Sequence, residues 1–213
     1  MVLAAIVVLG LAQLILPRIA ESMIASRIGR YGKVESVHVS AWPAVELLWG
    51  HVDSVRVRAR SLKLSAAQAA SLLWESRGVS RMDVQAGAVE LGRLRVTAAM
   101  LTKRGGALSA AAQASEADVG AALPPGFSLR LIRSEAGEVE VQSSGGLFGI
   151  GASVDAVAAA REGKLVARPR GLLLGAFQLT LFSDPHVHVE GVGASVAQSQ
   201  PLSYRLTISA SLR

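Results

Sequence analysis

The pattern of hydrophobic and polar positions divides the chain into a helical start and a long series of alternating segments. The first 16 residues are apolar apart from one glutamine. Over residues 16–28 apolar positions recur at helical spacing, with Arg27 inside the apolar stripe, and Gly29 follows. This spacing predicts an amphipathic helix that ends near Gly29. From residue 34 onward, apolar and polar residues alternate with the period of two that is typical of β-strands.

The alternating part predicts many short strands and two short helices. Strands are expected over residues 34–40, 52–59, 81–91, 94–99, 127–132, 138–142, 152–160, 164–168, 186–194 and 202–212. One helix is expected over residues 65–77, and Ser115 opens a second one that ends before Pro124. No linker rich in proline or serine interrupts residues 34–213. We therefore predict an α+β fold: one domain over residues 17–213, in which a long curved antiparallel β-sheet packs on the N-terminal helix, with one or two further short helices.

Residues 1–16 are expected to form a membrane anchor or signal segment. A helix needs roughly 20 apolar residues to cross a bilayer core of ~30 Å, so this segment is short for a span. No basic region precedes it and no clean cleavage site follows, which favours an uncleaved membrane segment. A buried core helix is the alternative. Arg18, Arg27, Arg30 and Lys33 follow the segment, and by the positive-inside tendency they would keep the body of the protein in the cytoplasm.

The composition favours an aliphatic core or cavity. Hydrophobic residues make up 51% of the chain but aromatic residues only 4%, so alanine, valine and leucine carry most of the apolarity. The chain has no cysteine, which excludes a disulfide scaffold and a thiolate metal site.

The net charge of +6 is concentrated in residues 54–104, which hold ten basic and three acidic residues. This excess suggests an anionic partner, either lipid headgroups or nucleic acid, although a sheet face that is simply solvated gives the same pattern. Nucleic acid is the less favoured partner because Trp74 is the one aromatic residue of this segment and no nucleic-acid-binding motif is present.

The sequence contains no credible catalytic constellation. His186 and His188 share one face of a predicted strand and could bind a metal together with Asp184, but exposed strand residues give the same spacing. Serine is abundant, yet no G-x-S-x-G nucleophile elbow is present. We therefore expect no enzyme, no cofactor and no metal site. An envelope hydrolase that uses His186 or His188 is a third hypothesis after the two functions below.

The N-terminal block carries a family resemblance. It reads LPRIAESMIASRIG over residues 16–29 and then VESVHVSAWPAVELLWGHVDSVRVRARSL over residues 34–62. This order of helix, strand, aromatic–proline turn, L-L-x-G and alternating strand resembles the LmeA-like phospholipid-binding family of actinobacterial cell envelopes. The resemblance implies an exported protein, membrane-anchored or periplasmic, that holds phospholipid in an elongated cavity between helix and sheet, as in tubular lipid-binding folds. It also implies a role in envelope lipid or lipoglycan maturation.

The resemblance and the apolar pattern together give a set of candidate lipid-binding residues. Arg56 and Arg58 are expected to attract lipid headgroups, and apolar side chains to contact acyl chains. The apolar candidates are Ile19, Met23, Ile24, Ile28, Val37, Val39, Trp42, Leu47, Leu48 and Trp49. Trp42 and Trp49 could instead lie at a membrane interface or pack in the core. The alternative function is an envelope structural or interaction protein that docks a partner through its basic sheet face and binds no lipid.

Overall fold

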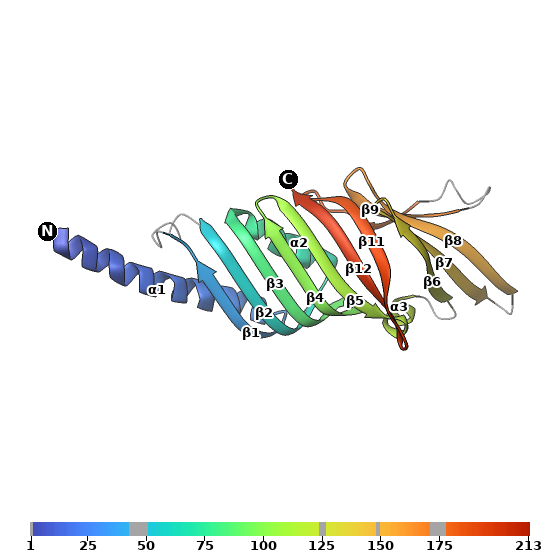
Figure 1. Cartoon of the computed structure of the whole chain (residues 1–213), viewed down its shortest axis with the longest axis horizontal. Helices are drawn as coiled ribbons and strands as arrows, with labels where there is room; N and C mark the ends of the chain where they lie inside the picture. Colours follow the sequence, from blue (N-terminus) through green and yellow to red (C-terminus); the bar gives the residue numbers. More distant parts are fainter. Residues whose placement is uncertain (1, 43–50, 124–126, 148–149, 171–177) are drawn as a thin grey trace.

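The computed structural model describes residues 2–42, 51–123, 127–147, 150–170 and 178–213. The molecule is elongated: a long helix, α1 (Val2–Gly29), leads into a seven-stranded sheet, and a five-stranded sheet lies at the opposite end (Figure 1). The predicted α+β class is confirmed, with a curved sheet, an N-terminal helix and two further short helices, α2 (Ala66–Glu75) and α3 (Glu116–Ala122).

The seven-stranded sheet, sheet A, provides the main face of the molecule. Its strands, in spatial order, are β1 (Gly32–Ser40), β2 (Val52–Leu64), β3 (Val79–Leu91), β4 (Leu94–Arg104), β5 (Ala107–Ser115), β12 (Leu202–Leu212) and β11 (Val187–Ser199). Neighbouring strands are antiparallel except β2 and β3, which are parallel because α2 and the 3-10 turn η2 (Ser76–Gly78) cross between them. Ser65 begins α2, since its side chain accepts a hydrogen bond from the Gln68 amide at 3.2 Å.

The five-stranded sheet, sheet B, replaces the far part of the single sheet that the sequence predicts. Its strands, in spatial order, are β10 (Leu179–Phe182), β9 (Lys164–Pro169), β8 (Ile150–Arg161), β7 (Glu138–Leu147) and β6 (Phe127–Glu135). Two hairpin tips of sheet B meet the edge of β11. The Val189 amide donates to Gly163 O at 2.9 Å, and the Val192 amide donates to Gly137 O at 3.2 Å. The edge of β11 therefore forms hydrogen bonds with two turns of sheet B rather than with another strand.

Helix α1 continues without a break through the predicted boundary at residue 16. Pro17 lies inside the helix, although the sequence alone suggests that this proline opens or kinks it. Within the described residues, no helix is both long and apolar enough to cross a membrane. Arg27, which interrupts the predicted apolar stripe, lies at the surface and its Nη2 is 3.0 Å from Glu75 Oε2 at the end of α2.

Strands β2 and β4 extend beyond their predicted ends because the alternation shifts phase there. Ala59 and Leu62 of β2 pack into the same cluster although they are three positions apart. In β4, Ala98 has a φ of 47° and the pairing with β5 changes register between Thr97 and Met100. A bulge of this kind breaks the period of two, so the sequence pattern stops while the strand continues.

Alternation gives sheet A an apolar inner face and a polar outer face. One inner row crosses all seven strands and is buried throughout; it consists of Val39, Val55, Met82, Lys103, Leu108, Ala210 and Val189. A neighbouring outer row consists of His38, Arg56, Asp83, Thr102, Ser109, Ser209 and Gly191. The three helices pack on the inner face, where Ile24 of α1, Leu73 of α2 and Val119 of α3 contact its buried clusters.

Candidate functional site

A second inner row is apolar on every strand and is covered at one end only. It consists of Val37, Val57, Val84, Leu101, Ala110, Ile208 and Val192. Ile24 and Ile28 of α1 pack against the β1–β2 end of this row, where Val37 is 8% and Val57 only 1% exposed. At the other end Ile208 is 40% exposed. The row therefore passes from closed core to open apolar surface along the inner face.

The open part of the inner face lies between α2 and α3. Ala70 of α2 covers Leu108 and Ala210, and Val119 of α3 packs with the cluster of Ala114. Between these two clusters is a surface that we call the apolar strip. It consists of Ala110, Val192, Ala194, Val196 and Ile208. Val196 is 53% exposed. Because Ala110 and Ala194 have small side chains, an extended hydrocarbon chain can approach the backbone of the sheet closely.

Sheet B has one apolar face, and its opposite face combines charged residues with the buried Ala159 and Val166. Register places a half-buried apolar set on one face, namely Leu129, Leu131, Val141, Val154 and Ala156. The other face holds an ionic cluster: Glu140 Oε2 is 3.1 Å from Arg133 Nη2, and Arg170 contacts the same carboxylate. Helix α3 contacts β6 as well as β4, β5 and β12, so it lies where the two sheets meet.

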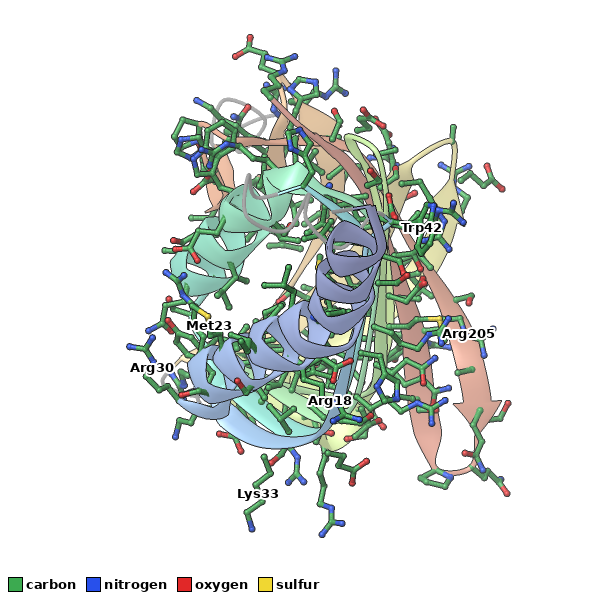
Figure 2. All side chains as sticks on the ribbon, turned by 90° about the vertical axis from the view of Figure 1, so that its left-hand side faces the viewer. Arg18, Met23, Arg30, Lys33, Trp42 and Arg205 are labelled. Carbon is green, nitrogen blue, oxygen red and sulfur yellow. The ribbon has the colours of Figure 1, made fainter. Side chains whose placement is uncertain are left out.

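The predicted apolar residues of α1 divide between two sides of the helix. Ile24 and Ile28 are half-buried against sheet A, whereas Ile19 is 49% and Met23 is 67% exposed. The reason is geometric: successive helical residues are rotated by about 100°, so Ile19 and Met23 lie beside the line of contact rather than on it. Figure 2 shows Met23 and Arg30 on one flank of α1.

The remaining predicted residues lie in three different environments. Val37 and Val39 are 8% and 7% exposed and belong to the core under α1. Trp42 is 76% exposed, while Leu47, Leu48 and Trp49 lie outside the described residues. Arg56 and Arg58 are exposed on the outer face, opposite Val55 and Val57 of the same strand. The structure thus brings Ile24, Ile28, Val37 and Val39 together, and it separates them from the two arginines by the thickness of the sheet.

The apolar strip was not predicted as a site. The sequence shows the apolar face of residues 202–212, including Ile208, but it does not show that Ala110 of β5 and Val192 of β11 lie on either side of it. Those pairings join distant parts of the chain, so only the folded structure reveals them.

A hollow of about 670 Å³ lies beside α1, along the free edge of β1. Its charged and hydroxyl-bearing lining residues are Arg18, Glu21, Ser22, Lys33, Glu35 and Ser36. Ala25, Val34 and Val37 also line the hollow. Acyl chains bound there would remove the neighbouring charged groups from water, which makes this hollow less favourable for them than the apolar strip.

The predicted histidine pair is occupied by other contacts. The His186 ring stacks on Trp74 with centroids 4.3 Å apart, and its Nδ1 is 3.3 Å from Asp184 Oδ1. His188 Nε2 is 3.2 Å from Arg213 Nη2. Among the described residues, no three histidine, cysteine or acidic side chains are grouped closely enough to hold a metal ion.

Lys103 is the single charged side chain of the two inner rows. It is 1% exposed, and its Nζ donates to the backbone carbonyl of Val79. Burial removes the ammonium from water and lowers the pKa of Lys103 below its usual value of 10.5. The side chain is charged in the unfolded state at neutral pH, so its lowered pKa in the folded protein reduces stability there.

Replacing Lys103 with Met is expected to raise the free energy of unfolding at pH 7 by about 1 kcal/mol, because removal of the buried charge outweighs loss of one hydrogen bond. In the natural chain, stability should rise as the pH increases from the lowered folded-state pKa towards 10.5, because the unfolded state then binds more protons. Urea unfolding between pH 7 and 10 measures both effects. Lys63→Met, at an exposed residue, is the control and should change stability by less than about 0.5 kcal/mol. A destabilised Lys103→Met protein would show that the cation stabilises the fold.

Comparison with known proteins adds one decisive observation. A family model described as LmeA-like phospholipid-binding matches residues 9–209. The chain belongs to the LmeA-like phospholipid-binding family. The match includes all of β1 to β11 and most of β12, and therefore both sheets, α2, α3 and the apolar strip. Searches of curated proteins and of solved structures found no significant match. Membership of this family indicates a phospholipid-binding protein.

Proposed function

We propose that this member of the LmeA-like family is a non-enzymatic phospholipid-binding protein that holds acyl chains against the apolar strip. The observation that supports the proposal is the exposure of Ile208 and Val196 on an inner face that is otherwise closed by helices. Burying each methylene of an acyl chain contributes about 0.8 kcal/mol, so contact over several carbons gives substantial affinity. The open side of the strip leaves the headgroup in water.

The covered end of the second inner row supports different roles for the two ends of this row, one as closed core and the other as binding surface. Ile24, Ile28, Val37 and Val39 pack against one another and form a closed core. We propose that they support the binding face rather than contact lipid. Lipid transfer between membranes, and a role in envelope lipid or lipoglycan maturation, are further parts of this proposal.

We also propose that the protein is exported and held at a membrane, with residues 1–16 as the anchor or signal segment. The family resemblance and the apolar composition of this segment support that location. Arg56 and Arg58 then favour an anionic lipid surface over a neutral one, and their contribution should weaken as salt increases.

Native mass spectrometry of the full chain, purified from a lipid-containing host and followed by organic extraction, tests the proposal. The expected result is phospholipid bound in stoichiometric amount, which organic solvent removes. A well-folded protein without bound lipid, which also takes up none from vesicles, would reject the acyl-chain site.

A second function, docking of an acidic partner through the outer face, has its own support. Arg56, Arg58 and Arg81 are exposed and form no ion pair with any residue that the structure describes. Neighbouring charges are paired: Arg60 Nε is 3.2 Å from Glu35 Oε1, and Arg104 Nη2 is 3.2 Å from Asp83 Oδ1. This function predicts salt-sensitive partner binding without bound lipid.

A further inference from the structure

Helix α1 connects an apolar stretch of sequence directly to the domain. The helix is continuous from Val2 to Gly29, and Ala20, Ile24 and Ile28 pack on sheet A. Figure 1 shows its N-terminal part projecting beyond the sheet, at the end of the molecule opposite sheet B. Because the helix is continuous, insertion of its N-terminal part into a membrane would also fix the orientation of the domain relative to that membrane.

Strand β1 returns along α1 towards that projecting part. The β1 amide of Val39 donates to Glu21 Oε1 at 3.0 Å, and His38 Nδ1 is 3.7 Å from the same oxygen. Because β1 is fixed to α1 at Glu21, the end of β1 at Ser40 and the following Trp42 lie towards the N-terminal side of this residue. Figure 2 looks at that end of the molecule, where Trp42 is labelled.

The surface at this level combines an indole, an aliphatic side chain and a cation. Trp42 is 76% exposed, and its backbone amide is held by Asp53 Oδ2 at 2.7 Å. Ile19 is 49% exposed, and Arg18 beside it is exposed as well. An exposed tryptophan on a fixed backbone is costly in water, but indole is favoured at the boundary between lipid and water, where arginine can bind phosphate.

We infer that this end of the domain contacts the bilayer surface, with α1 inserted to about residue 16, Trp42 at the headgroup level and sheet B pointing away from the membrane. The inference rests on the proposed membrane location. Fifteen helical residues extend about 22 Å, which is less than the ~30 Å hydrocarbon core. Insertion to that depth brings Arg18, Ile19 and Trp42 to the surface while the apolar strip stays outside the bilayer.

Tryptophan quenching by lipids tests this orientation in the full chain. The vesicles contain phosphatidylcholine and phosphatidylglycerol, with bromine atoms near the carbonyl end of the acyl chains. Trp49→Phe/Trp74→Phe leaves Trp42 as the reporter. Trp42→Phe/Trp49→Phe leaves Trp74, which is half-buried on α2, as the matched control. Flotation measures membrane association of both variants.

Bromine should reduce the Trp42 emission at least twofold and the Trp74 emission by less than about a tenth. Failure of the chain to float with vesicles, or flotation with equal quenching of both reporters, would overturn the inference. Neither failure bears on the acyl-chain site, because the mass spectrometry above measures bound lipid in protein extracted from membranes. Conversely, selective Trp42 quenching in a protein without bound lipid would support the orientation and reject the lipid-holding function.

Discussion

Replacement of Ile208 with Asp is expected to weaken phospholipid binding by more than about tenfold. Ile208 lies in the middle of the apolar strip between Ala110 and Val192, and acyl chains bound there would bury its side chain. A carboxylate in that position loses water without gaining a partner, which costs several times the 1.4 kcal/mol that corresponds to a tenfold change in affinity. Because Ile208 is 40% exposed in the free protein, the fold itself should tolerate the change.

Thr207→Asp is the matched control for this prediction. Thr207 is the preceding residue of the same strand, is exposed, and faces the outer side of sheet A. The two variants have the same added charge on opposite faces of the sheet. Lipid per protein, measured by native mass spectrometry, should fall for Ile208→Asp and stay unchanged for Thr207→Asp, with similar urea midpoints for both. Equal lipid content in the two variants would show that the acyl chains lie elsewhere.

The sequence predicts most elements because local pattern determines them, but the alanine-rich β5 (Ala107–Ser115) and the short β10 (Leu179–Phe182) lie outside the predicted strands. The final strand, β12, has the predicted limits of residues 202–212, since its alternation is uninterrupted. Ser115 caps α3 as expected, with its hydroxyl accepting from the Asp118 amide at 3.1 Å. Where a bulge shifts the alternation, as at Ala98 in β4, the pattern stops before the strand does.

The sequence does not predict the tertiary contacts between elements that are distant along the chain. Nothing local shows that the β11 edge meets the turns at Gly137 and Gly163, and this contact divides the predicted single sheet into two. Likewise, the helical spacing of α1 gives a broad stripe, and only the position of sheet A decides that Ile24 is half-buried and Met23 exposed. The division of the predicted residues between closed core and exposed surface follows from these tertiary contacts.

The alternating pattern of β2 places apolar residues on one face of sheet A and basic residues on the other. Alternation places Val55 and Val57 inward and Arg56 and Arg58 outward, as the sequence suggests. A phospholipid on the inner face cannot also reach those arginines through the sheet. In the proposed function the basic residues would act on a membrane surface and the apolar strip on the bound lipid, so salt should change membrane association without changing lipid occupancy.

The turn between α1 and β1 determines whether α1 can pack on sheet A. Gly32→Ala in this turn is expected to lower the free energy of unfolding by about 3 kcal/mol. A β-carbon at Gly32 would lie 2.0 Å from the backbone oxygen of Ser61 and 2.9 Å from Leu62 Cα on the paired strand. Backbone atoms of β2 cannot rotate away, so the start of β1 must leave its register. Urea unfolding followed by circular dichroism measures the loss.

Gly29→Ala separates this contact from a general effect of adding a methyl group. Gly29 ends α1, three residues before Gly32, and no atom lies within 4 Å of a β-carbon built there. Alanine favours helix over glycine by about 1 kcal/mol, so Gly29→Ala should be neutral or more stable than the natural chain. Comparable destabilisation by both variants would contradict a specific role for the Gly32–Ser61 contact. If Gly32→Ala is the less stable variant and still binds lipid, the apolar strip binds lipid without complete packing of α1 on sheet A. Loss of lipid together with stability would instead mean that the core under α1 holds the binding face in shape.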